Sequence, residues 1–292
     1  MSEPISPSAS PLPQAEAASG GLAAGSVPKL EIRDLFMSYV DRAGKVVQAV
    51  EGVELTLANK PGVGELAVVL GPSGCGKSTI LKAIAGLYTP DSGTLLIDGQ
   101  PIFGTGRDRG MVFQSYTSFA WLTVRKNVEY GLKLAGVPAE ERKKRSLEIL
   151  AQVGLRDFAD AYPKQLSGGM KQRVAIARSL INHPRILLMD EPFGALDPQT
   201  RFGMQTLILD VLKKQDNTAL FVTHDISEAV YLADVIYVLS HRPAKVLHRI
   251  EVPHFEDRSP MVKQSPRFKE VENHLLDVLH KLDVKGNVRL GL

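Results

Sequence analysis

A glycine-rich segment that ends in lysine, serine and threonine is the part of this sequence best suited to chemistry. It matches the phosphate-binding pattern G-x-x-x-x-G-K-[ST]. Glycines let backbone N–H groups surround phosphate oxygens, and a following helix adds the positive end of its dipole. We therefore expect a nucleotide to bind here. The segment consists of Gly71, Pro72, Ser73, Gly74, Cys75, Gly76, Lys77, Ser78 and Thr79.

Two residues of this loop have specific expected roles, and the flanking sequence supports them. Lys77 would reach the β- and γ-phosphates, and the Ser78 hydroxyl would bind Mg²⁺. The apolar run 65–70 predicts a buried parallel strand, and residues 80–85 predict the beginning of a helix. A chance glycine-rich turn would lack this strand–loop–helix context, so we favour the nucleotide site.

Polar residues also follow three further predicted strands of the sheet. Gln114 ends the strand predicted from residue 109, Asp190 and Glu191 follow the strand 186–189, and His224 follows 219–223. Strands that alternate with helices predict a mostly parallel sheet, which binds ligands at the carboxyl ends of its strands. These residues are therefore predicted to share one site.

The two consecutive acids have different expected roles. Asp190 would hold the Mg²⁺ shell opposite Ser78, through water. Glu191, one position further, would orient and deprotonate the attacking water near the γ-phosphate. A simple pair of solvated acids is the alternative, and the neighbouring phosphate loop argues against it.

A second helix end is also suited to phosphate. Residues 166–170 read Leu-Ser-Gly-Gly-Met, in which Ser167 is a natural helix cap while Gly168 and Gly169 leave the N-terminus bare for an anion. Because one phosphate loop is already present, this second end predicts a composite site between two chains.

The remaining chain predicts the elements around these motifs. Strands at 30–33, 46–50 and 53–57 flank a turn at 41–44 and predict an antiparallel hairpin. Tyr39 lies at its mouth, either as an ordinary strand aromatic or stacked on adenine. Residues 115–165 predict inserted helices. Ser265 caps a predicted amphipathic helix that is expected to pack onto its own domain rather than a partner.

Composition limits the function classes. The chain has 292 residues, 44% apolar and 23% charged, with a net charge of +3 and no basic stripe on the scale that nucleic acid requires. No apolar run approaches the ~18–20 residues that cross a bilayer. Cys75, the only cysteine, excludes an intrachain disulfide and suits the cytosol. Its position beside Lys77 at a helix N-terminus predicts a lowered thiol pKa and a reactive site that MgATP protects.

The order of these motifs resembles the ATP-binding subunits of ATP-binding-cassette (ABC) transporters over about residues 29–250. Tyr39 takes the adenine-stacking position, Gln114 that of the Q-loop glutamine and His224 that of the switch histidine. Residues 71–79 correspond to Walker A, 166–170 to the signature, 186–191 to Walker B, and 194–197 to the D-loop, which ends at Asp197.

This resemblance implies an α/β P-loop NTPase fold with a mostly parallel core sheet, an antiparallel β subdomain and an inserted helical subdomain at about 115–165. It also implies a head-to-tail dimer, of identical or paralogous chains, that binds ATP and Mg²⁺ and closes on ATP. Glu191 would be the base, His224 would contact the γ-phosphate, and Gln114 would touch Mg²⁺ and the attacking water. The partner chain would supply Ser167, Gly168, Gly169 and Asp197.

Segments 108–114, 119–124 and 189–197 further resemble the nitrate/sulfonate/taurine branch of importers, which usually has Pro at the position of Ala120 and Gln at that of Met170. The implied partners are a transmembrane permease and, indirectly, a periplasmic or extracellular substrate-binding protein, with the chain peripheral on the cytoplasmic face of the inner membrane. Trp121 would lie either in the groove for the permease's coupling helix or in the core of the helical subdomain.

The expected division is a disordered tail at 1–28, the ATPase domain at 29–250 and an extension at 251–292 with the amphipathic helix. Two other functions remain as alternatives. A soluble ABC ATPase could act on ribosomes or DNA, but translation-type members carry two cassettes and DNA-repair members a long coiled-coil insertion. A non-hydrolysing nucleotide sensor would not need Glu191 and His224 intact.

Overall fold

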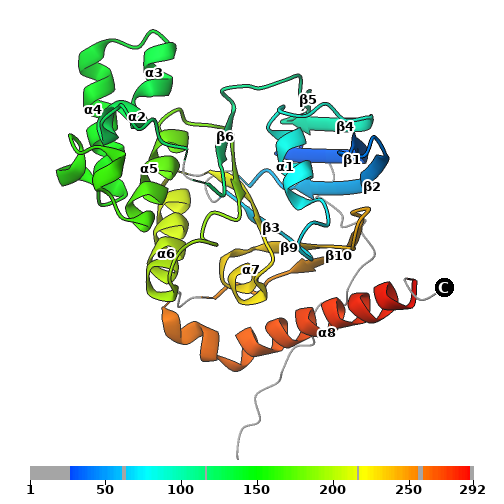
Figure 1. The fold of residues 1–292 in the computed structure, drawn as a ribbon. Helices are drawn as coiled ribbons and strands as arrows, with labels where there is room; N and C mark the ends of the chain where they lie inside the picture. Colours follow the sequence, from blue (N-terminus) through cyan, green and yellow to red (C-terminus); the bar gives the residue numbers. More distant parts are fainter. Residues whose placement is uncertain (1–26, 61–63, 116, 216, 256–258, 290–292) are drawn as a thin grey trace, which may run out of the picture.

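The computed structural model describes residues 27–60, 64–115, 117–215, 217–255 and 259–289. The expected disorder of residues 1–28 falls almost entirely outside these ranges. Two sheets and the helices around them make up the described fold (Figure 1).

A six-stranded sheet in the order β10-β9-β3-β8-β7-β6 forms the centre. Five neighbouring strands are parallel and β10 is antiparallel at the edge, which confirms the mostly parallel core. The four inner strands β9, β3, β8 and β7 are buried along their whole length, because both faces of the sheet are covered there. The strands are β3 (Leu66–Leu70), β6 (Arg109–Val112), β7 (Ile186–Asp190), β8 (Thr218–Thr223), β9 (Val235–Leu239) and β10 (Val246–Glu251).

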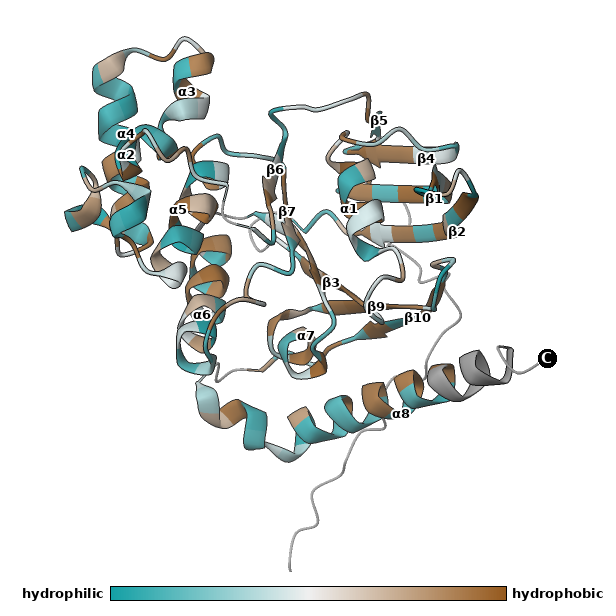
Figure 2. Cartoon of the chain, viewed as in Figure 1, coloured by the Kyte–Doolittle hydropathy of each residue, from teal (hydrophilic) through white to brown (hydrophobic). Residues whose placement is uncertain are grey.

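Alternate residues of the central strands enter two separate cores, one on each face. Val68 packs with residues of α5 (Gly168–Leu180), α6 (Pro198–Gln215) and α7 (Ile226–Leu232). Val69 packs on the opposite face with α1 (Lys77–Ile84) and the smaller sheet. The brown colour of the inner strands in Figure 2 shows that they are mostly hydrophobic, as burial on both faces requires.

The smaller sheet is antiparallel, in the order β2-β1-β4-β5, and confirms the predicted hairpin. The Asp41 carboxylate accepts hydrogen bonds from the Ala43 and Lys45 amides and fixes the predicted turn. The two strands expected at 46–50 and 53–57 form a single strand. The four are β1 (Leu30–Val40), β2 (Val46–Leu57), β4 (Ser92–Ile97) and β5 (Gln100–Pro101).

Helices fill the chain between β6 and α5, as predicted, and lie on the side of the molecule away from the antiparallel sheet (Figure 1). The buried Asn127 side chain holds the segment that leads into these helices. It accepts a hydrogen bond from the Phe119 amide at 2.7 Å and donates to the Phe119 and Leu122 carbonyls at 3.0 Å. Trp121 is 74% exposed, so its expected alternative as a core residue is wrong. The elements are α2 (Val124–Val128), α3 (Tyr130–Leu134), α4 (Ala139–Gln152), η1 (Arg156–Phe158) and η2 (Pro163–Gln165).

The chain ends in η3 (Pro260–Gln264) and the long helix α8 (Pro266–Arg289), which runs below α7 in Figure 1. Ser265 Oγ accepts a hydrogen bond from the Phe268 amide, as expected of a cap. Phe268 and Leu275 are fully buried in the same core as α7. The predicted packing of this helix onto its own chain is therefore confirmed. In the described part of the chain, helices long and apolar enough to cross a membrane are absent.

Candidate active site

The phosphate loop joins the carboxyl end of β3 to α1 and needs glycine at two positions. Gly74 and Gly76 have φ values of 72° and 129°, which other residues rarely adopt. A Cβ at Gly76 would lie 2.8 Å from the Ala49 carbonyl oxygen. Gly76 is also the N-cap of α1 and offers no side-chain oxygen to its first amides, which suits an anion at this helix end.

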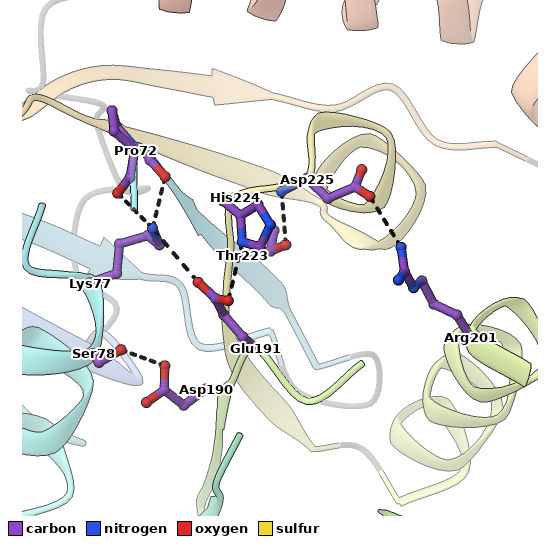
Figure 3. Close-up of polar contacts among 10 residues, drawn as sticks. Pro72, Lys77, Ser78, Asp190, Glu191, Arg201, Thr223, His224 and Asp225 are labelled. Carbon is purple, nitrogen blue, oxygen red and sulfur yellow. Dashed lines mark hydrogen bonds and ion pairs between the residues drawn. The ribbon is translucent and has the colours of Figure 1, made fainter. Parts of the chain in front are cut away.

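Lys77 is buried at the base of this loop, and its ammonium is held within it. Nζ donates to the carbonyl oxygens of Gly71 and Pro72 at 2.8 and 2.9 Å, and it lies 3.9 Å from Glu191 Oε1 (Figure 3). The Lys77 ammonium is thus surrounded by three oxygen atoms. A phosphate group in the loop could replace them as its partner.

Ser78 and Asp190 form a second direct contact, 2.7 Å between Oγ and Oδ1 (Figure 3). Burial at the end of β7 raises the pKa of Asp190, and the hydrogen bond from Ser78 opposes that rise. Hydroxyl and carboxylate oxygens are ligands that Mg²⁺ accepts. The described residues contain no group of three or more His, Cys, Asp or Glu that could hold a metal ion.

Glu191 connects Lys77 with His224. His224 Nδ1 lies 3.1 Å from Glu191 Oε2, while the other carboxylate oxygen faces Lys77 (Figure 3). The backbone of Glu191 has a φ of 41°, a left-handed conformation in which its N–H donates a hydrogen bond to the Val222 carbonyl at 3.0 Å. Such strain in a non-glycine residue is concentrated at functional sites. The structure thus brings four of the predicted residues, Lys77, Glu191, His224 and Asp190, to neighbouring strand ends.

The cavity beside this cluster has a volume of about 690 Å³, within the range of small-molecule sites. The half-exposed ring of Tyr39 contributes to its wall, which keeps adenine stacking as a prediction for this residue. Gln114 lies two residues beyond β6 with an exposed side chain and is not among the residues that line the cavity.

The residues expected to act in trans gather elsewhere, at the beginnings of α5 and α6. Ser167 is exposed, and its Oγ accepts a hydrogen bond from the Met170 amide. Gly169 packs so closely on Thr200 that a Cβ would lie 2.6 Å from Cγ2. Asp197 is exposed, and its carboxylate accepts a hydrogen bond from the Thr200 amide. This hydrogen bond lowers the pKa of the Asp197 carboxyl. Within one chain this cluster does not line the cavity.

The structure contradicts the expectation of a reactive Cys75. Its side chain is 2% exposed and belongs to the core beneath the loop. Burial raises the pKa of the thiol, although the charges of Lys77 and Arg242 oppose the rise. The spacing correctly placed Cys75 at the helix N-terminus but did not show that its side chain points inward.

Two arginines at the site were missed by the sequence reasoning. Arg242 lines the cavity from the turn after β9. Arg201 lies 3.6 Å from Asp225, the residue after His224 (Figure 3). It also donates a hydrogen bond to the Leu196 carbonyl, in the segment that resembles the D-loop. The rule that identified Asp190 applies equally to Arg242, since Arg242 also follows the carboxyl end of a parallel strand.

Comparison with known proteins agrees with this geometry. The family model described as ABC transporter matches residues 52–194. The nitrate import ATP-binding protein of Synechocystis sp. is 47% identical over 256 residues, 86% of this chain and 94% of that protein. The chain belongs to the ATP-binding subunits of ABC transporters.

Two further relatives support the same family. The taurine import ATP-binding protein of Rhizobium johnstonii is 42% identical over 87% of this chain and 97% of its own. A dimeric ATP-binding cassette, solved in a post-hydrolysis state with ADP and phosphate, superimposes with a TM-score of 0.65 at 34% identity, over 77% of this chain and all of that one. The expected P-loop fold and the resemblance to nitrate and taurine importers are confirmed, and this ABC ATPase binds and hydrolyses ATP.

Proposed function

We propose that this ABC ATPase drives an importer for a small anion or organic solute of the nitrate, sulfonate or taurine type, with the solute passing through a separate permease. The site carries the ATPase part of this proposal by one observation: the Lys77–Glu191–His224 chain of contacts beside the Ser78–Asp190 bond. The two import relatives support the solute class.

Each residue of the cluster has a role that its position supports. The Lys77 ammonium would exchange its two carbonyl partners for β- and γ-phosphate oxygens, to which it is more strongly attracted. Ser78 and Asp190 would hold Mg²⁺, which when bound with ATP neutralises charge that develops on the transferred phosphoryl group. Tyr39 would stack on the adenine.

The attacking water would be activated by Glu191. Its carboxylate accepts the proton, and the contact with His224 fixes its orientation. His224 would in turn contact the γ-phosphate, and Gln114 would reach Mg²⁺ and the water when the chain closes around the nucleotide.

The second half of the site would come from a second copy of this chain or a paralogous ATPase. Ser167, Gly168 and Gly169 present the bare N-terminus of α5, and Asp197 lies on the neighbouring segment. Ser167 and Asp197 are exposed, which supports a role facing another chain, since a helix N-terminus favours a γ-phosphate.

The proposed arrangement places residues 29–250 as the ATPase domain on the cytoplasmic face of the membrane, bound to the permease. The helical subdomain at about 115–165 would lie against the permease, with exposed Trp121 at the contact. A periplasmic or extracellular binding protein would deliver the solute, and nucleic acid would have no part.

Hydrolysis is tested by Glu191→Gln, which keeps the shape of the side chain but removes the base. We expect kcat to fall by about 10²–10⁴-fold with ATP affinity retained, measured by phosphate release and by binding of a fluorescent ATP analogue. Turnover at the wild-type rate would remove Glu191 from the mechanism.

The transport function is tested by affinity purification of the tagged chain from detergent-solubilised membranes, followed by mass spectrometry. A multi-span permease in stoichiometric amount would support the importer, and its binding protein would then identify the solute. Ribosomal proteins or nucleic acid without a membrane partner would favour the soluble ABC ATPase instead.

A further inference from the structure

Arg242 is a cavity-lining cation that the mechanism above does not use. Its Nε and Nη2 donate to the Gly74 carbonyl at 3.1 and 2.6 Å, and its Nη1 donates to the Tyr39 hydroxyl at 2.6 Å. Gly74 belongs to the phosphate loop, whereas Tyr39 belongs to the antiparallel sheet. One guanidinium therefore connects two walls of the cavity that come from different sheets.

The backbone that carries Arg242 is itself fixed to the antiparallel sheet. The Ala244 amide donates to the Ala49 carbonyl at 2.9 Å, and the Glu51 amide donates to the Ala244 carbonyl at 3.0 Å. Lys245 and Glu51 add an ion pair at 2.7 Å. Since Ala49 and Glu51 lie on β2, the neighbour of the strand that holds Tyr39, these contacts attach the turn to the hairpin.

The phosphate loop meets the same junction. A Cβ on Gly76 would lie 2.8 Å from the Ala49 carbonyl oxygen and 3.1 Å from Ala244 Cβ, so loop, β2 and turn pack without room for a side chain. Arg242 adds a charged link on the exposed side of this junction. The positive charge of Arg242 also reaches the loop. It opposes the rise that burial causes in the pKa of Cys75.

The position of the guanidinium leaves the aromatic ring usable. Arg242 Cζ lies 5.7 Å from the Tyr39 ring centroid, near the outer limit of about 6 Å for a cation–π contact. Because Nη1 binds the hydroxyl, the guanidinium lies toward the hydroxyl edge rather than over the ring centre. A flat base can still stack on the ring.

We propose that Arg242 is a positioning residue for the nucleoside triphosphate, holding the Tyr39 ring at a fixed distance from the phosphate loop so that base and triphosphate bind together. This inference rests on the proposed nucleotide site and adds a residue that determines affinity. Among the described residues its hydrogen bonds go to Gly74 and Tyr39, not to Glu191 or His224, so it affects binding rather than the chemical step.

The direct test is Arg242→Gln, measured by binding of a fluorescent ATP analogue and by ATPase kinetics. We expect Kd and KM for ATP to rise about ten-fold, the loss of charge-assisted hydrogen bonds, with kcat within about two-fold of wild type. Arg242→Lys should have a Kd between those of the wild type and Arg242→Gln, since an ammonium keeps the charge but cannot reproduce the several hydrogen bonds of the planar guanidinium. Arg42→Gln, at an exposed arginine in the β1–β2 turn, is the matched control.

A double-mutant cycle shows whether Arg242 acts through the tyrosine. Tyr39→Phe keeps the ring and removes the hydroxyl that Arg242 binds. In that background Arg242→Gln should cost clearly less affinity than in the wild type, because the two changes remove one shared contact. Equal costs in both backgrounds would overturn the coupling, and melting temperatures of all variants verify that they fold.

The outcomes separate this inference from the proposed function. If the wild type binds ATP and Arg242→Gln binds it equally well or more tightly, Arg242 does not position the nucleotide. If the wild type itself does not bind ATP, the proposed nucleotide site fails and the inference fails with it.

Discussion

The phosphate loop and the N-terminus of α5, which are both predicted to bind phosphate, differ in how many partners each finds within one chain. The phosphate loop already has its partners within the chain, since Lys77 contacts two carbonyls and Glu191, and Ser78 bonds to Asp190. The end of α5 has Ser167 exposed and does not line the cavity. One chain thus builds the first half of the site, and we propose that the second half, at the start of α5, serves a second chain.

The carboxylates of the two halves differ in the same way. Burial raises the pKa of Asp190, whereas the hydrogen bond from the Thr200 amide lowers the pKa of exposed Asp197. The half proposed to hold Mg²⁺ has its carboxylate, Asp190, in a poorly solvated position, where a cation would be strongly attracted. The half that faces outward keeps its acid solvated and ionised.

The largest expected effect comes from a substitution in the phosphate loop. Lys77→Gln removes the buried cation and should weaken ATP binding by a single chain about 100-fold, because charge-assisted bonds to phosphate are lost. Equilibrium binding of a fluorescent ATP analogue at low protein concentration measures this. Lys82→Gln, in the same helix and at the cavity rim, is the comparison, and an equal loss in both variants would contradict the special position of Lys77.

A smaller effect is expected where α5 meets α6. Gly169→Ala would place a Cβ 2.6 Å from Thr200 Cγ2 and should destabilise the fold by about 1–3 kcal/mol through overpacking. Thr200→Ser removes that methyl group and should recover most of the loss in urea unfolding. Gly203→Ala is the matched control, because a Cβ there meets nothing within 4 Å and a helical alanine should stabilise by up to about 1 kcal/mol. A destabilised Gly203→Ala variant or no rescue by Thr200→Ser would count against the packing account.

The smallest effect concerns pH. Burial raises the pKa of Glu228, against the hydrogen bonds from Thr223 and Gln205. Between the unfolded value of about 4.3 and this raised folded value, the folded state binds more protons, so stability falls as pH rises.

Glu228→Gln should therefore gain stability over the wild type as pH rises through that window, by on the order of 1 kcal/mol at neutral pH. Melting temperatures at a series of pH values test this. Glu148→Gln, at an exposed position of α4, controls for the loss of one negative charge. A gain that is constant with pH would exclude the titration of Glu228 as its cause.

The sequence could predict the residues whose positions follow from topology. Asp190, Glu191 and His224 were predictable because parallel strands bring their carboxyl ends together. The inward direction of Cys75 was not, because spacing locates a helix start but not the packing of one side chain in a turn. The position of Arg242 after a parallel strand follows the same rule, but its contact with Gly74 was not predictable, since it joins residues 168 positions apart and depends on how β9, β10 and β2 meet.

The measurement that tests the composite site most directly is the mass of the Glu191→Gln chain in solution, by light scattering, with and without MgATP. The account predicts an ATP-dependent dimer. It also predicts that adding Ser167→Arg leaves ATP binding by the single chain unchanged but keeps the chain monomeric, while adding Ser167→Ala, which loses only the helix cap, still allows the dimer. A Glu191→Gln chain that stays monomeric at saturating MgATP, or a dimer that tolerates Ser167→Arg, would contradict the account.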